Sequence, residues 1–244
     1  MRTILLNVEY EGTAYAGWQS QTNGLAVQDV VESALAQILK QDVRIHSSGR
    51  TDAGVHARSM PAHFRTDSNI PLSAFREGAN RFLPPDVVIR EVREMPENFH
   101  ARYSAKGKWY RYTIYTGEMR SPLNSRTAWH LRGSLDLDLL RSAAKLLEGQ
   151  HDFHVFRTSG CVAKTSIRDI YHVDIAHDLE RIYIDVKGSG FLRNMVRIMV
   201  GTLVEVGQGK RPVTDLPKLL LAEEGVICGP TAPAHGLCLQ EVYY

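Results

Sequence analysis

The sequence predicts an α+β fold made of two ferredoxin-like, RNP-like α/β halves with a mainly antiparallel sheet. Two observations lead to this prediction. Strand and helix patterns alternate in the order β-α-β-loop-β-α-β through the first hundred residues, and the rest of the chain repeats this order more loosely. We expect an N-terminal half over residues 1–104 and a C-terminal half over residues 105–244. A single mixed sheet, divided differently, is the alternative.

The first half opens with a strand over residues 3–10. A helix follows, because apolar residues between Val27 and Leu39 recur at helical spacing. The later elements expected here are a short strand near 43–47, an extended stretch over 62–65, a helix over 71–82 and a strand over 87–92. This order matches the split β-α-β arrangement, in which two helices cover an antiparallel sheet.

The second half contains the same kinds of pattern with less regular spacing. Its expected elements are a strand over 108–116, a helix over 136–147, a hairpin of 167–175 and 181–186 turning across residues 177–179, a long helix from about 191 to 206, a charged helix near 213–224 and a closing strand over 237–242. No low-complexity linker separates the halves.

The composition fits a cytoplasmic protein without a membrane segment. A chain of 244 residues with 43% hydrophobic content can bury a substantial core, and no apolar run approaches the ~20 residues that a membrane-spanning helix needs. The N-terminus turns polar too soon for a signal peptide. Cys161, Cys228 and Cys238 lack C-x-x-C spacing, and the histidines lack H-E-x-x-H spacing, so we expect no disulfide framework and no metal site.

Two glycines, Gly49 and Gly54, bracket a short polar stretch that contains Asp52. Glycines suit a loop that turns sharply or lets a ligand come close. Arg50 lies two residues away, and a nearby guanidinium keeps a carboxylate ionised and therefore nucleophilic. Asp52 is thus a candidate nucleophile. The alternative is a structural role, in which Thr51 or Asp52 caps a helix or forms an Asx-turn.

Cations and aromatic rings are interleaved along the strand from residue 108 to 112. On an extended strand Lys108, Tyr110 and Tyr112 share one face, and Trp109 and Arg111 share the other. Flipped bases stack on aromatic rings while basic side chains hold phosphates, so the strand is a candidate base platform. The alternative is an amphipathic strand with its tyrosines in the core and its charges in water.

The expected helix over 190–201 carries arginines among apolar residues. Arg193, Arg197 and Gly201 follow one another at a spacing of four, which predicts that they share a helix face. An arginine on a buried helix needs an anionic partner, either a carboxylate of the fold or an RNA phosphate. A guanidinium that reaches solvent at the end of its apolar stem is the alternative.

Seven motifs occur in order along nearly the whole chain. They are Gly17-Trp18-Gln19 with Val27-Gln28, residues 48–57 around Asp52, Asn80-Arg81-Phe82-Leu83-Pro84-Pro85-Asp86, Phe99-His100-Ala101-Arg102 with Lys108-x-Tyr110-x-Tyr112, His151-Asp152-Phe153-x-x-Phe156, Phe191-Leu192-x-x-Met195-Val196-Arg197, and Ala232-Pro233-x-x-Gly236-Leu237. With these motifs the sequence resembles the TruA-type tRNA pseudouridine synthases.

The resemblance implies an isomerase with the pseudouridine synthase fold. Such an enzyme acts as a homodimer, without cofactor, on uridines at positions 38, 39 and 40 of the tRNA anticodon stem-loop. Asp52 matches the catalytic aspartate, Tyr110 the tyrosine that packs on the target uracil, and Arg197 the basic residue paired with that aspartate. Leu237 resembles the aliphatic residue that lines the pocket. Arg50 matches a position beside the aspartate on the RNA side.

Three other function classes are compatible with parts of this pattern. An RNA-binding protein without catalysis could use the same aromatic strand. A metal-dependent nuclease or deaminase would need clustered ligands, which the spacing does not offer. A small-molecule glycosidase would want a second carboxylate within ~5–10 Å of Asp52.

Overall fold

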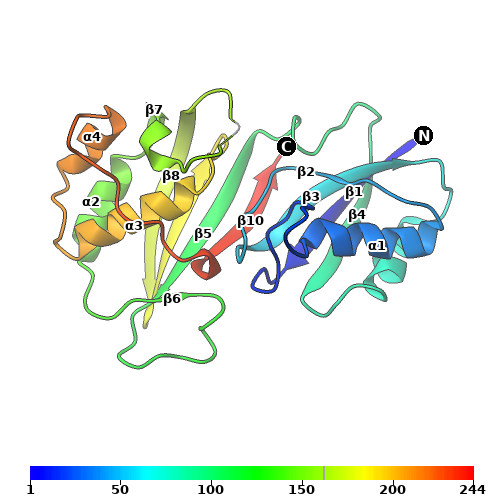
Figure 1. Cartoon of the computed structure of the whole chain (residues 1–244), viewed down its shortest axis with the longest axis horizontal. Helices are drawn as coiled ribbons and strands as arrows, with labels where there is room; N and C mark the ends of the chain where they lie inside the picture. The colour runs from blue at the N-terminus through cyan, green and yellow to red at the C-terminus, as the bar shows by residue number, and fades with distance from the viewer. Residues whose placement is uncertain (162) are drawn as a thin grey trace. The chain divides into compact units, whose positions relative to one another are not determined.

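The computed structural model describes residues 1–161 and 163–244, and it divides the chain into two compact units. The first unit contains Met1–Lys106 and Cys238–Tyr244, and the second contains Gly107–Leu237. Each unit combines helices with a mainly antiparallel sheet, which confirms the α+β class (Figure 1).

The sheet of the first unit has the ferredoxin-like strand order β4-β1-β3-β2. Strand β1 pairs antiparallel with β3 and with β4, and β2 pairs antiparallel with β3. The strands are β1 (Arg2–Tyr10), β2 (His46–Ser47), β3 (His56–Thr66) and β4 (Val87–Met95). All expected strands of this half are therefore present, and β3 is longer than the sequence indicated.

Two helical segments accompany this sheet. Helix α1 (Val27–Leu39) buries Val27, Val31 and Leu35, as its apolar spacing predicts, and the Asp29 carboxylate accepts a 3.0 Å hydrogen bond from the Ala26 N–H at its start. The expected helix over 71–82 is present, and its middle, η1 (Ala74–Gly78), is a π-helix. Its buried Phe75 packs edge-on against Phe64 of β3, with 5.5 Å between the ring centroids.

The second unit has a sheet in the order β5-β9-β8-β7, in which each neighbouring pair is antiparallel. Helices α2 and α3 pack on each other, and α2 packs on β8. The elements are β5 (Gly107–Tyr115), β6 (Trp129–His130), α2 (Leu137–Lys145), β7 (Gly149–Asp152), η2 (His154–Phe156), β8 (Ile167–Asp178), β9 (Arg181–Gly188), α3 (Met195–Gly207), α4 (Asp215–Leu220) and η3 (Ala234–Gly236). Strand β10 (Leu237–Tyr243) begins at the last residue of this unit and continues in the first.

Several boundaries of the second unit differ from expectation. Helix α3 begins at Met195 and not near residue 191, because Asn194 has a left-handed backbone with φ 60°. The hairpin between β8 and β9 turns at residues 179–180, where Leu179 has φ 51°, and not across 177–179. The short strands β6 and β7 were not expected from the sequence, and α4 is shorter than the charged helix near 213–224.

The closing strand also differs from the expected division of the chain. Residues 238–244 belong to the first unit, because β10 pairs parallel with β3 at Cys238 and Leu239. The Tyr244 hydroxyl donates a 2.8 Å hydrogen bond to the Ala101 carbonyl, and the Tyr243 carbonyl accepts one from the Lys106 N–H. The chain thus returns to the unit in which it began.

All three cysteines are free thiols. Over residues 1–161 and 163–244, no helix has the length and apolar character needed to cross a membrane. In the same described residues, no group of three or more histidine, cysteine, aspartate or glutamate side chains is arranged to hold a metal ion.

Three histidines of the first unit nevertheless lie close together. The ring centroids of His63 and His100 are 4.6 Å apart, and those of His46 and His63 are 5.5 Å apart. Burial, followed by the charge of His100, lowers the pKa of His63 to about 4. Burial also lowers the pKa of His100, whose Nδ1 accepts backbone hydrogen bonds from Arg102 and Tyr103 and must therefore be unprotonated. Within this cluster, His63 and His100 are therefore held as neutral imidazoles.

The free energy of unfolding is expected to fall as the pH drops from about 6.5 towards 4. Because His63 titrates near pH 4 in the folded protein and near 6.5 when unfolded, the unfolded state binds more protons in this window. The loss amounts to at most about 3 kcal/mol. Denaturant unfolding at pH 7 and pH 5 measures it. His63→Gln should weaken the dependence of the free energy of unfolding on pH, whereas the control His177→Gln, in the exposed hairpin, should leave it unchanged. If the free energy of unfolding changed equally with pH in the wild type and in His63→Gln, His63 could not be its cause.

Candidate active site

The loop that carries Asp52 is held mainly through its backbone. The Thr51 carbonyl accepts a 3.2 Å hydrogen bond from the Trp18 N–H, and the Asp52 carbonyl accepts a 3.1 Å bond from the Val55 N–H. Gly54 has φ 77°, a conformation that suits glycine at the third position of this turn. No helix starts here, since the next element is β3, so the helix-cap alternative for Asp52 is wrong.

Two glycines of a second loop lie directly against this backbone. A Cβ atom on Gly17, which has φ 101°, would lie 2.6 Å from the Thr51 carbonyl oxygen. A Cβ atom on Gly12 would lie 2.1 Å from the Val55 carbonyl oxygen. Gly12 also donates its N–H to Nδ1 of the buried His56, at 2.8 Å. Only residues without a side chain fit these positions, so the two loops pack backbone to backbone.

The side chains around Asp52 point in different directions. Thr51 is buried, and its hydroxyl shares a 2.8 Å hydrogen bond with the hydroxyl of Tyr10 at the end of β1. Arg50 is exposed, and Asp52 is half-buried. The Thr51 side chain thus anchors the loop to the core, while the residues on either side of it stay accessible to a ligand.

Strand β5 carries Tyr110 on its buried face. The Tyr110 ring is 8% exposed and packs edge-on against Phe191, with 5.3 Å between the centroids. Tyr112 is fully buried, and its hydroxyl donates a 2.8 Å hydrogen bond to the Pro233 carbonyl. Burial raises the pKa of the Tyr112 phenol. Tyr112 is therefore a core residue, and Tyr110 keeps a small accessible edge.

The opposite face of β5 is a hydrogen-bonded cluster around Asp185. The Asp185 carboxylate accepts 2.8 Å hydrogen bonds from the Trp109 indole and from two nitrogens of Arg111. The Arg111 guanidinium lies over the rings of Trp109 and Tyr183, at 5.4 and 5.0 Å. The predicted alternation of faces is confirmed.

Arg197 lies in the first turn of α3 and is half-buried. Its Nε donates a 2.7 Å hydrogen bond to the Ala232 carbonyl, and its Nη1 donates a 2.7 Å bond to Oδ1 of Asn194. Arg193 precedes the helix and donates to the Ser159 carbonyl at 3.1 Å, so the prediction that Arg193 and Arg197 share a helix face is wrong. The left-handed Asn194 between them breaks the helical spacing.

The segment before β10 packs against α3 and β5. A Cβ atom on Gly201 of α3 would lie 1.7 Å from the Pro230 carbonyl oxygen, and one on Gly236 would lie 2.5 Å from the Tyr112 ring. Leu237 follows at the start of β10 and is 5% exposed. Gly201 and Gly236 therefore have to lack side chains for the segment to pack in this way. The segment continues directly into Leu237.

The expected site residues fall into two groups. Arg50 and Asp52 lie in the first unit, whereas Tyr110, Arg197 and Leu237 lie in the second. The pairing of Asp52 with Arg197 stays a prediction. Sequence reasoning missed Tyr10 and Asn194 as supporting residues, and it considered Thr51 only as a possible helix cap or Asx-turn residue. The proximity of Asn194 to Arg197 in the sequence was the only available signal, because the contacts of Tyr10 with Thr51 join distant segments.

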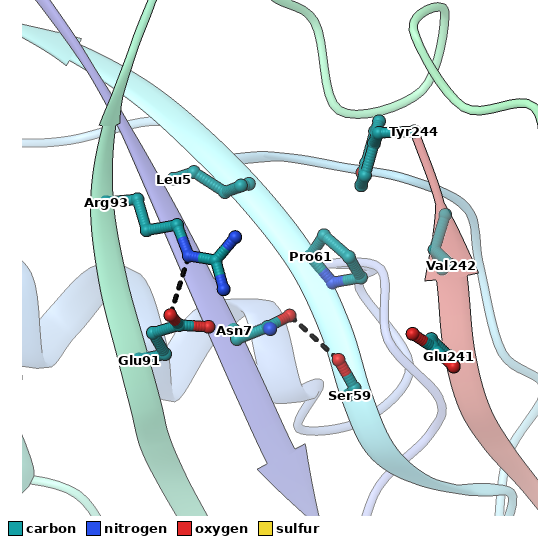
Figure 2. A pocket seen from close by; sticks show the side chains of 9 residues that line it. All are labelled: Leu5, Asn7, Ser59, Pro61, Glu91, Arg93, Glu241, Val242 and Tyr244. Carbon is teal, nitrogen blue, oxygen red and sulfur yellow. Dashed lines mark hydrogen bonds and ion pairs between the residues drawn. The ribbon is translucent and has the colours of Figure 1, made fainter.

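Two shallow hollows lie away from these residues. One lies on the sheet of the first unit, where Arg93 pairs with Glu91 and Ser59 bonds to Asn7 (Figure 2). The other is formed by residues 157–161 with His154 in the second unit. Neither of these two hollows is lined by a residue of the expected site.

Comparisons with known proteins point to one family. A family model described as tRNA pseudouridine synthase matches residues 7–104 and 143–244. The chain is 57% identical to tRNA pseudouridine synthase A of Syntrophotalea carbinolica, over 100% of this chain and 97% of that protein. It is 56% identical to tRNA pseudouridine synthase A of Geobacter sulfurreducens, over 100% of both chains. A solved Cbf5-Nop10-Gar1 complex matches with a TM-score of 0.39 and 10% identity, over 97% of this chain and 48% of that one, a similarity too low to support an argument.

Proposed function

This chain belongs to the tRNA pseudouridine synthase family, and from that premise we propose that it converts uridine to pseudouridine at positions 38, 39 and 40 of the tRNA anticodon stem-loop, with Asp52 as the nucleophile. Membership of the family makes it an isomerase that modifies tRNA. The positions in the tRNA and the role of each residue are the proposed part.

The construction of the Asp52 loop is the observation that carries the proposal. Gly17 lies against the backbone at Thr51, Thr51 is anchored to Tyr10, and Asp52 remains half-buried beside the exposed Arg50. A carboxylate on a loop whose backbone is held by close packing and hydrogen bonds is pre-organised for attack on a substrate placed beside it. These contacts support a catalytic role for Asp52 more than a loosely packed surface turn would.

The reaction breaks the C1′–N1 glycosidic bond of uridine, turns the uracil and forms a C1′–C5 bond. N1 takes up a proton and the proton at C5 leaves to water, so the product is an isomer of uridine and no redox agent is consumed. Asp52 could attack C1′ of the ribose, attack C6 of uracil, or assist the formation of a glycal, and each route uses an ionised carboxylate. Arg197 would stabilise that carboxylate, and the three routes stay open.

The target nucleotide has to leave the base stack before this chemistry. Flipping costs a few kcal/mol, which stacking of the uracil against Tyr110 can offset. Tyr110 could also accept the C5 proton, directly or through water. Leu237 would line the base pocket, and the exposed Arg50 would occupy the vacated space or hold the adjoining phosphate. We further propose that the enzyme works in the cytoplasm as a homodimer.

Transfer RNA tritiated at uridine C5 tests the proposal. Isomerisation must release tritium to water, whereas an RNA-binding protein without catalysis releases none. Sequencing of the product RNA for pseudouridine then locates the modified positions. Release with pseudouridine at positions 38 to 40 supports the full proposal. Release with pseudouridine elsewhere would overturn the assigned positions while leaving the isomerase activity intact.

Arg197→Met should reduce turnover far more than tRNA binding. If Arg197 holds the Asp52 carboxylate in the reacting complex, its loss is expected to lower kcat by about 10²–10³-fold, the effect of removing one pre-organised charge-stabilising group. The dissociation constant for tRNA should change by less than about threefold. Arg141→Met, which removes an exposed guanidinium of α2 in the same unit, is the matched control. Weaker binding with normal turnover would instead indicate a phosphate-binding role for Arg197.

A further inference from the structure

Asn194 occupies the N-cap position of α3 but does not cap it. A capping asparagine has an extended backbone, and its side chain accepts a hydrogen bond from the second or third helical N–H. Asn194 instead has φ 60° and ψ 4°, and its side chain makes no cap bond. Asparagine is one of the few residues other than glycine that adopts this conformation at low cost. The left-handed backbone therefore explains why only a small set of residue types suits position 194. It does not explain the contacts of the Asn194 side chain.

The two ends of the Asn194 amide have different partners. Oδ1 accepts the 2.7 Å hydrogen bond from Nη1 of Arg197, and Nδ2 donates a 2.9 Å bond to the Thr158 hydroxyl. The segment at Thr158 is itself tied back, since Arg193 donates to the Ser159 carbonyl at 3.1 Å. Thr158 therefore orients the amide so that its oxygen faces the guanidinium.

Asn194 and Ala232 together hold the Arg197 guanidinium on two edges. The Ala232 carbonyl accepts from Nε and the Asn194 oxygen accepts from Nη1, both at 2.7 Å. Because the guanidinium is a rigid planar fork, two bonds to different nitrogens fix its plane and the direction of all its N–H groups. Both acceptors are neutral, so the orientation is obtained without cancelling the positive charge.

We propose that Asn194 is a positioning residue that fixes the orientation of the Arg197 guanidinium for its role in catalysis. The proposal rests on the proposed function, in which Arg197 pairs with Asp52. An amide suits this task better than a carboxylate, because an aspartate at residue 194 would form its own ion pair with Arg197 and compete with Asp52. Thr158 supports the orientation from the far side of the amide.

Asn194→Gly and Asn194→Asp separate this role from helix capping. Glycine keeps the left-handed backbone and removes the amide, so kcat should fall about 10-fold with KM nearly unchanged. Aspartate should lower kcat about 100-fold, because it also neutralises the charge that Arg197 offers. A capping role predicts the reverse order, since aspartate is a good N-cap. Thr158→Val should lose less activity than Asn194→Gly, and Thr158→Ser should restore it.

A second measurement does not depend on activity. The Arg197 Nε–H resonance in NMR spectra should show slow solvent exchange in the wild type and faster exchange in Asn194→Gly. Unchanged exchange together with unchanged kcat in Asn194→Gly would overturn the positioning role. Arg197→Met could keep full turnover while Asn194→Gly increased the solvent exchange of the Arg197 Nε–H. In that case Asn194 would still orient Arg197, and the proposed pairing of Arg197 with Asp52 would be wrong.

Discussion

Replacing Asp52 with asparagine is expected to abolish pseudouridine formation. Asparagine has nearly the same shape but cannot supply the negative charge that each of the three routes requires. Loss of a covalent nucleophile lowers kcat on the order of 10⁴-fold or more, so tritium release from labelled tRNA should fall to the level of the blank. The loop itself should keep its conformation, because its bonds to Trp18 and Val55 come from backbone atoms.

The control for this variant is Asp42→Asn, which removes a carboxylate from an exposed position of the same unit. It should release tritium at the wild-type rate. Asp52→Asn should also bind tRNA with a dissociation constant close to that of the wild type and unfold at the same denaturant concentration. Release at the parental rate by Asp52→Asn would show that the nucleophile lies elsewhere, whatever the other variants do.

Elements with a strong periodic pattern could be predicted from the sequence. The apolar spacing between Val27 and Leu39 reports directly on one buried helix face, and the protein has a helix with these bounds. Strands β6 and β7 could not be predicted in this way, because segments of two and four residues carry too little periodicity and depend on pairing with β5 and β8. The start of α3 was missed for a different reason. Apolar spacing does not report a left-handed residue such as Asn194.

The same distinction applies to the candidate site, of which some features could be predicted from the sequence and others could not. The glycines around Asp52 predicted a constrained loop, since glycine signals unusual backbone geometry wherever it occurs. The sequence could not reveal that Gly17 and Tyr10 hold that loop, because these contacts join residues more than thirty positions apart. The four-residue spacing of Arg193 and Arg197 was misleading, since spacing has meaning only inside a continuous helix.

Replacing Gly201 with alanine would favour the helical backbone but would also create a steric clash. In the interior of α3, replacing glycine with alanine would normally stabilise the helix by about 1 kcal/mol. At Gly201 the new Cβ would lie 1.7 Å from the Pro230 carbonyl oxygen and 2.9 Å from the carbonyl carbon. Backbone atoms cannot rotate away as a flexible side chain can, so the segment around Pro230 has to move as a whole.

Movement of that segment would break the bonds that tie it to α3. The Gly229 N–H donates to the Thr202 hydroxyl at 3.0 Å, and Ala232 exchanges backbone and side-chain bonds with Arg197 at 3.1 and 2.7 Å. Each hydrogen bond contributes about 0.5–1.5 kcal/mol. Their loss, together with the overpacking, exceeds the gain in helix propensity. The same displacement removes one of the two acceptors that orient the Arg197 guanidinium.

Gly201→Ala is therefore expected to lower the free energy of unfolding by about 2–4 kcal/mol, and to lower turnover at temperatures where the protein remains folded. Gly207→Ala is the control on the same helix, since the three atoms nearest to a Cβ there belong to the side chains of Leu135 and Leu140 and not to backbone. Its free energy of unfolding should change by less than about 1 kcal/mol. Denaturant unfolding and single-turnover tritium release measure the two effects. A stabilised Gly201→Ala would mean that the Pro230 segment is not packed on α3, and the Ala232 carbonyl could then no longer be regarded as an anchor for Arg197.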